Sequence, residues 1–79
     1  MITSGQIKAA RALLGITATK LAEISEVAYT TVVRMESSNG IPSGQVKTLD
    51  AVQRALEEAG IEFIGTPEAG AGVRWRIDR

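Results

Sequence analysis

The chain has 79 residues, enough for one small domain with a modest core. Hydrophobic residues make up 44% and charged residues 23%, which excludes a disordered or fibrous chain. Cysteine and histidine are absent, so thiol nucleophiles, imidazole bases and the usual zinc sites are excluded, and we expect no catalytic residues, no metal and no cofactor. Nine basic and nine acidic residues give zero net charge, which argues against a strongly basic nucleic-acid binder.

The charges are unevenly distributed along the chain. Residues 1–54 carry a mild positive excess, whereas acidic residues gather between positions 57 and 68. Any surface that faces DNA should therefore lie in the first part. The apolar stretches are too short to span a membrane, and residues 1–5 lack the regions of a signal peptide. We therefore expect a cytoplasmic protein that does not contact membranes.

The first expected element is a helix over roughly residues 4 to 14. Thr3 and Gln6 have capping-box spacing, and Gly15 can end the helix. Apolar residues recur between them at helical intervals, namely Ile7, Ala10 and Leu14.

Two short helices are expected next. Thr17 is a good N-cap for the first, which ends at 25–26. Its expected inner residues are Leu21, Ala22 and, as a further candidate, Ile24. The second, over 28–37, places Val32 and Met35 on one face, and turn-forming residues 37–43 predict a loop after it.

The strongest apolar stripe predicts a fourth helix, followed by Gly60 as a C-terminal cap. Its expected members are Val46, Leu49, Val52 or Gln53, Leu56 and Ala59. Beyond it, residues 61–64 and 73–77 alternate like half-buried strands around a loop over 65–72. Because an isolated hairpin is only marginally stable, it should lie on the helices or pair with the hairpin of another subunit. The prediction is a mainly α chain with a four-helix region over 1–60 and a β-hairpin over 61–79.

Two short helices joined by a few residues match the helix-turn-helix arrangement that sets a recognition helix in the DNA major groove. Ala22 has the small side chain that such motifs require between their helices, and Val27, Val32 and Met35 occupy the apolar positions that hold the second helix to the core. From about residue 5 to residue 59 the chain resembles the Cro and cI repressor family, also called the xenobiotic-response-element family. The resemblance implies a four-helix Cro/cI-like domain.

The resemblance also implies a DNA-binding surface. It places base-reading positions at Tyr29, Thr30 and Arg34, with Val33 close enough for a thymine methyl group. Candidate phosphate contacts are Thr17, Thr19 and Lys20 by resemblance, and Ser37, Ser38 and Lys47 by side-chain chemistry. The alternative for this polar face is simple solvation.

Two further sets of residues have structural expectations. The resemblance implies an ion pair between Arg11 and Glu36, for which the alternative is two solvated charges. Phe63, Trp75 and Ile77 are candidate anchors of a dimer, which would present two recognition helices to half-sites about 34 Å apart. Their alternative role is to cover the core of their own chain.

Three residues depart from the family pattern. Ala18 stands where the family often has a DNA-contacting Gln. Ala28 stands where the family has a Ser or Thr that caps the recognition helix, and this change costs about 1 kcal/mol of helix stability unless Ser25 or water takes over as the cap. Glu26 replaces the usual turn glycine, which costs about 1 kcal/mol if the position keeps a positive φ.

The resulting hypothesis is a sequence-specific DNA-binding regulator, specifically a repressor, that uses helix 28–37 as a homodimer on an inverted-repeat operator of double-stranded DNA. The alternative is a helix-turn-helix scaffold that has lost DNA binding and binds another regulatory protein, such as an antiactivator or an antitoxin-like subunit. Neutral charge and the residues at 18, 26 and 28 favour this alternative. An enzyme is not expected, because Ser, Thr and Glu residues are scattered.

Overall fold

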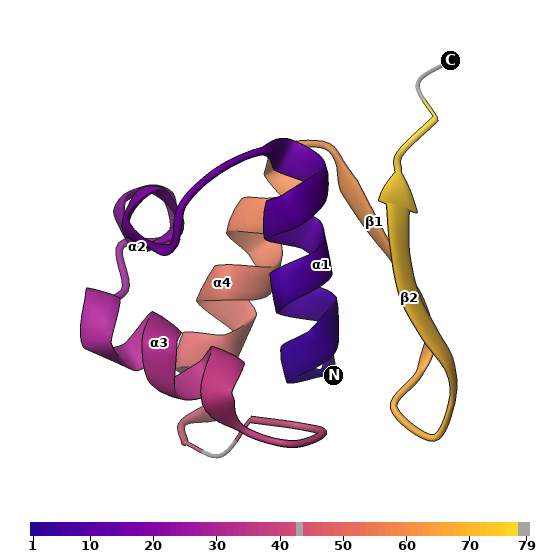
Figure 1. Ribbon diagram of the computed structural model, residues 1–79, viewed down its shortest axis with the longest axis horizontal. Helices are drawn as coiled ribbons and strands as arrows, with labels where there is room; N and C mark the ends of the chain where they lie inside the picture. The colour runs from indigo at the N-terminus through magenta and orange to yellow at the C-terminus, as the bar shows by residue number, and fades with distance from the viewer. Residues whose placement is uncertain (43, 78–79) are drawn as a thin grey trace.

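Four helices followed by a two-stranded antiparallel hairpin make up the computed structural model, which describes residues 1–42 and 44–77 (Figure 1). The elements are α1 (Ser4–Leu14), α2 (Ala18–Ser25), α3 (Tyr29–Ser37), α4 (Val46–Glu58), β1 (Ile61–Thr66) and β2 (Ala69–Trp75). The prediction of a mainly α chain with a C-terminal hairpin is confirmed. Ser43 of the expected loop and residues 78–79 of the expected hairpin segment lie outside the described residues.

Local hydrogen bonds explain where the first two helices begin. At α1, the Thr3 hydroxyl accepts from the Gln6 N–H, and the Gln6 side chain accepts from the Thr3 N–H, which is the expected capping box. Gly15 then ends α1 in the left-handed conformation with φ 69°. At α2, the Thr17 hydroxyl accepts from the Lys20 N–H. The predicted caps of both helices are therefore confirmed.

One core joins all four helices to the first strand. Its buried members include the fully enclosed side chains of Ile7, Leu21, Val32 and Leu56. Each such aliphatic side chain contributes roughly 1.5–3 kcal/mol through its removal from water. Ile61 of β1, which is 1% exposed, lies in the same cluster. The hairpin thus shares its core with the helices.

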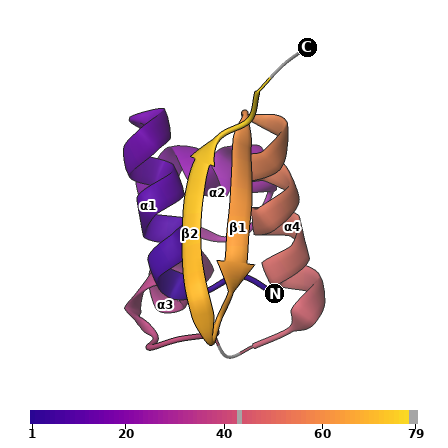
Figure 2. The same ribbon diagram turned by 90° about the vertical axis from the view of Figure 1, so that its right-hand side faces the viewer.

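The hairpin covers the side of the molecule formed by α1 and α4, with β2 along α1 and β1 along α4 (Figure 2). Gln6, only 5% exposed, fastens it there. Its Nε2 donates to the carbonyl oxygens of Ile64 and Gly72, at 3.1 and 2.9 Å. These two residues face each other across the strands, so a single α1 side chain holds both strands.

The hairpin is longer than predicted. The first strand continues to Thr66 and the second begins at Ala69, so the prediction of a loop over 65–72 is wrong. Ile77, which was predicted in the second strand, lies beyond the end of β2. Gly65 has φ 76° at an irregularity in the register, where a Cβ would collide with the carbonyl group of Gly70. Only glycine fits this approach.

Three residues predicted on the inner faces of helices are exposed, and one of them, Ala59, lies just after α4 as its C-cap. Ile24 is 39% exposed, and Val46, which begins the predicted stripe of α4, is 58% exposed. Ser25 is instead buried in the last turn of α2, where its hydroxyl donates to the Leu21 carbonyl oxygen. Val46 opens α4 before the helix reaches the other elements, since the buried residues of α4 begin at Leu49.

Candidate functional site

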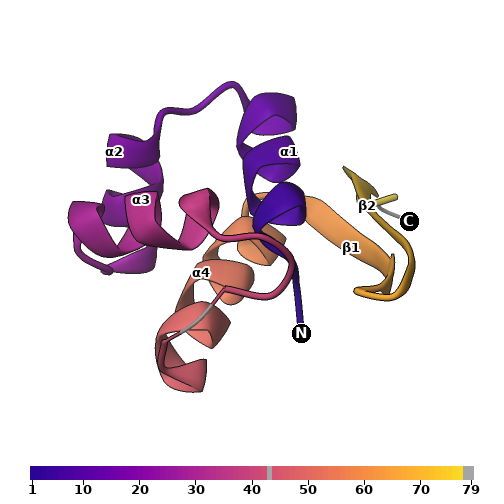
Figure 3. The same ribbon diagram turned by 60° about the horizontal axis from the view of Figure 1, so that its bottom comes forward.

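Helix α3 presents one packed side and one open side. Val32 and Met35 are 0% and 4% exposed and belong to the core. The candidate base-reading residues lie together on the open side, where Tyr29 is 52% and Val33 is 38% exposed, and Thr30 and Arg34 are also exposed. Figure 3 shows α2 and α3 side by side at one end of the molecule, away from the hairpin. None of the chain's described tail covers this side.

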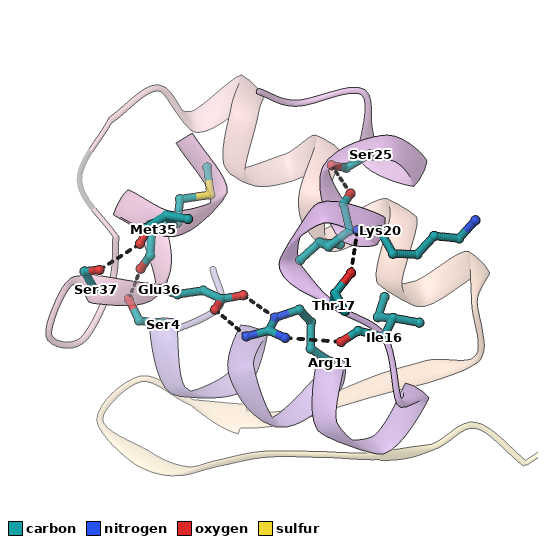
Figure 4. A network of polar contacts seen from close by, with 11 residues as sticks. Ser4, Arg11, Ile16, Thr17, Lys20, Ser25, Met35, Glu36 and Ser37 are labelled. Atoms are coloured by element: carbon teal, nitrogen blue, oxygen red, sulfur yellow. Dashed lines mark hydrogen bonds and ion pairs between the residues drawn. The ribbon is translucent and has the colours of Figure 1, made fainter. Parts of the chain in front are cut away.

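The C-terminal end of α3 is fastened to α1 by the expected ion pair (Figure 4). Arg11 donates from Nε and Nη2 to the two carboxylate oxygens of Glu36, at 2.7 and 2.8 Å. Its Nη1 donates to the Ile16 carbonyl oxygen at 3.1 Å. The hydrogen bonds with Glu36 raise the pKa of Arg11 above its ordinary value, although partial burial opposes this effect. The two-pronged geometry fixes the orientation of α3 against α1.

A second contact at this end was missed by sequence reasoning. The Ser4 hydroxyl, in a side chain that is 2% exposed, donates to the Met35 carbonyl oxygen near the end of α3. The Ser4 N–H donates to the carbonyl oxygen of Gly40 in the following loop. A serine at the start of a helix carries no sequence signal for such a long-range bond. Through these two hydrogen bonds, α1 holds both α3 and the loop that follows it.

The N-terminal end of α3 is held less firmly. Glu26 has φ 58° and is the only non-glycine residue with positive φ in the described part of the chain. Ala28 is the N-cap and forms no side-chain hydrogen bond with the helix. The Ser25 hydroxyl does not substitute for it, because it donates back into α2. The strained turn and the missing cap expected from the sequence are both present.

Several of the candidate phosphate-contacting residues already form hydrogen bonds or ion pairs within the chain. Thr17 and Thr19 are exposed at the start of α2, where Thr17 caps the helix, and Lys20 forms an exposed ion pair with Glu23 at 3.6 Å. The Ser37 and Ser38 hydroxyls donate to carbonyl oxygens of α3. They would have to exchange these bonds to donate to a phosphate. Lys47 is exposed on α4, outside α2 and α3.

A pocket beside Arg34 was also missed from the sequence. It measures about 220 Å³ and lies between α3 and the first turn of α4. Its polar lining includes Thr31 and Arg34 of α3, and Gln45 and Thr48 at the start of α4. Residues of α4 therefore adjoin the open side of α3.

The candidate dimer anchors separate into two kinds. Phe63 is half-buried and packs against the core of its own chain, which fits the alternative role given for it, and its role as a dimer anchor stays a prediction. Trp75 and Ile77 are 51% and 63% exposed. Trp75 lies on the same side of the hairpin as Ile61, and its ring passes close to Gly60.

Within the described residues, no cluster of acidic side chains could hold a metal ion. None of the helices in residues 1–42 and 44–77 has the length and hydrophobicity that a bilayer-spanning helix needs. A comparison with models of known protein families finds none that matches this sequence, and a search of curated proteins finds no match.

Proposed function

We propose that the chain is a sequence-specific DNA-binding regulator of the Cro/cI helix-turn-helix type, in which α2 and α3 form the motif and α3 enters the major groove. The observation that carries the proposal is the open side of α3, where Tyr29, Thr30, Val33 and Arg34 lie together above a buried side formed by Val32 and Met35. Arg34 suits guanine because a guanidinium can donate two hydrogen bonds to one base edge.

The start of α2 supports the same proposal. Exposed helix N-terminal amides attract anions, and Thr17, Thr19 and Lys20 are all exposed there. A phosphate on this end would set the position of α3 in the groove without reading sequence. Because the formal net charge is zero, a single copy offers few phosphate contacts, and we propose that a homodimer on an inverted repeat is the binding form.

The test is a selection from a random DNA library followed by mobility-shift titrations. We expect an enriched motif, and we expect Arg34→Ala to weaken binding to it by about tenfold or more, since a two-bond guanine contact is worth roughly 1–3 kcal/mol. The control is Arg74→Ala, which removes the same charge from the hairpin at the other end of the molecule. Failure to enrich any motif, or equal effects of the two substitutions, would refute the proposal.

A second candidate function is binding to another regulatory protein. The specific observation in its favour is the exposure of Trp75 and Ile77 on the hairpin, because large exposed apolar side chains are typical of protein-binding surfaces. A tagged chain would then retain one regulatory partner without DNA, and Trp75→Ser would release that partner while Arg34→Ala would not. DNA-dependent recovery of the partner would count against this candidate.

A further inference from the structure

The outer side of α4 carries a shallow groove that the proposed function leaves unassigned. One hollow lies over Val46, Lys47, Asp50 and Ala51, and a second lies between α4 and the end of α2, lined by Ile24, Ala51 and Glu58 among others. Both hollows include Ala51 and Arg54. The two hollows therefore adjoin each other along α4, and together they are called the groove, with the small side chain of Ala51 near its middle.

The charges along this groove alternate in sign. They are, in chain order, Lys47, Asp50, Arg54 and Glu58. The spacing places all four on one side of the helix, opposite the buried Leu49, Val52 and Leu56. Within residues 1–42 and 44–77 none of the four forms an ion pair, although Asp50 and Arg54 are spaced for one. These charges are available to a partner.

We infer that a second copy of this chain occupies the groove, with its α4 antiparallel to the first. A two-fold axis at the level of residues 52–53 places Asp50 opposite Arg54 of the second copy, and Lys47 opposite Glu58 of the second copy. Each opposition occurs twice by symmetry. A parallel arrangement would instead set like charges against each other. The Ala51 side chains lie near the axis, where their small size permits close approach of the two helices.

The position of the groove also suits the DNA complex of the proposed function, on which this part of the inference rests. The pocket lined by Arg34 and Thr48 shows that the start of α4 adjoins the open side of α3. In contrast, α3 and the hairpin lie at opposite ends of the longest dimension of the molecule, which is 34 Å (Figures 1 and 3). In a dimer formed through the hairpins, the two-fold axis would lie beyond the hairpin. The distance between the two α3 helices would then be nearly twice the length of the molecule. Half-sites about 34 Å apart need the shorter path through α4.

Sedimentation of the full chain without DNA tests the inference. We expect a monomer–dimer equilibrium that weakens as salt is added. Arg54→Asp and Asp50→Arg should each weaken self-association at least about tenfold, because each sets like charges opposite one another at two symmetric places. Both positions are exposed, and circular dichroism checks that each variant is folded.

Mixing the two variants gives the decisive measurement. An equimolar mixture should recover dimers, because one chain then presents Asp at both positions and the other presents Arg at both. Trp75→Ser is the control and should leave self-association unchanged. A wild-type chain that stays monomeric, a mixture that stays monomeric, or a dimer that dissociates with Trp75→Ser would each overturn the inference. Since no DNA is present, these outcomes are distinguishable from a failure of DNA binding, which the library selection measures separately.

Discussion

The two ends of α3 are held in different ways. Its C-terminal end is joined to α1 by the Arg11–Glu36 ion pair and by the Ser4 hydroxyl. Its N-terminal end follows a residue with positive φ, Glu26, and an uncapped first turn at Ala28. The same helix is thus oriented by contacts distant in sequence at one end and weakly specified by its local sequence at the other. A helix held this way has a fixed direction, while its first turn can adapt.

The largest expected effect comes from breaking the firm end. Glu36→Gln should lower the free energy of unfolding by about 2 kcal/mol, because it leaves the partly buried Arg11 guanidinium without a charged partner. Chemical denaturation measures the change. The matched control is Glu23→Gln in the exposed Lys20 pair, where we expect a change within about 0.5 kcal/mol. Equal losses at both sites would show that the enclosure of the Arg11 pair has no energetic weight.

A smaller effect of opposite sign should follow from repairing the weak end. Ala28→Ser supplies a hydroxyl to the unpaired N–H groups of the first turn and should raise the free energy of unfolding by about 1 kcal/mol. The comparison variant is Ala9→Ser in the exposed middle of α1, which should lower it by a few tenths of a kcal/mol. If Ala28→Ser has no stabilising effect, the N-terminal end of α3 is already satisfied by another group.

The turn before α3 offers a still smaller gain. Glu26→Gly removes the cost of a side chain at φ 58° but adds freedom to the unfolded chain, so we expect a net gain of about 0.5 kcal/mol. Thermal unfolding detects it as a higher Tm. Glu23→Gly, inside α2, should instead lower the Tm, because glycine is unfavourable within a helix. Loss of stability in both variants would contradict the strain attributed to Glu26.

The exposed Glu62–Arg74 pair of the hairpin sharpens the comparison with the enclosed pair of α3. Its hydrogen bonds with Arg74 lower the pKa of Glu62 below the ordinary 4.5. The pair therefore stabilises the fold above pH 4.5, and this contribution disappears as the pH falls through the lowered pKa. The Tm difference between the wild type and Glu62→Gln should be small near neutral pH and should vanish in acid. A difference that grows in acid would mean that the sign is wrong.

Features determined by neighbouring residues were predictable from the sequence. The capping box of Thr3 and Gln6, the left-handed Gly15 and the Thr17 cap all depend on residues within one helical turn. The buried sides of α1 and α3 follow from helical periodicity. Periodicity does not reveal which elements lie next to a helix, and for this reason Ile24 and Val46 were assigned to inner faces although both are exposed.

The rest depends on contacts across the fold. The glycine- and alanine-rich residues 69–72 lack the alternation that indicates a strand, yet they pair with β1. The Arg11–Glu36 pair was suggested by family resemblance and not by local chemistry. The pocket beside Arg34 and the bond from Ser4 to α3 could not be predicted, because each joins segments that only the folded chain brings together.

The two hydrogen bonds from Gln6 to the hairpin affect the order in which the parts of the chain can fold during synthesis. The Gln6 amide is enclosed by protein, and its acceptors are the carbonyl oxygens of Ile64 and Gly72. Before the ribosome has released the chain through Gly72, this amide must remain hydrated, and α1 cannot complete its final packing. A shortened chain that ends after α4 should therefore be cleaved by proteases faster than the full chain, although it contains all four helices.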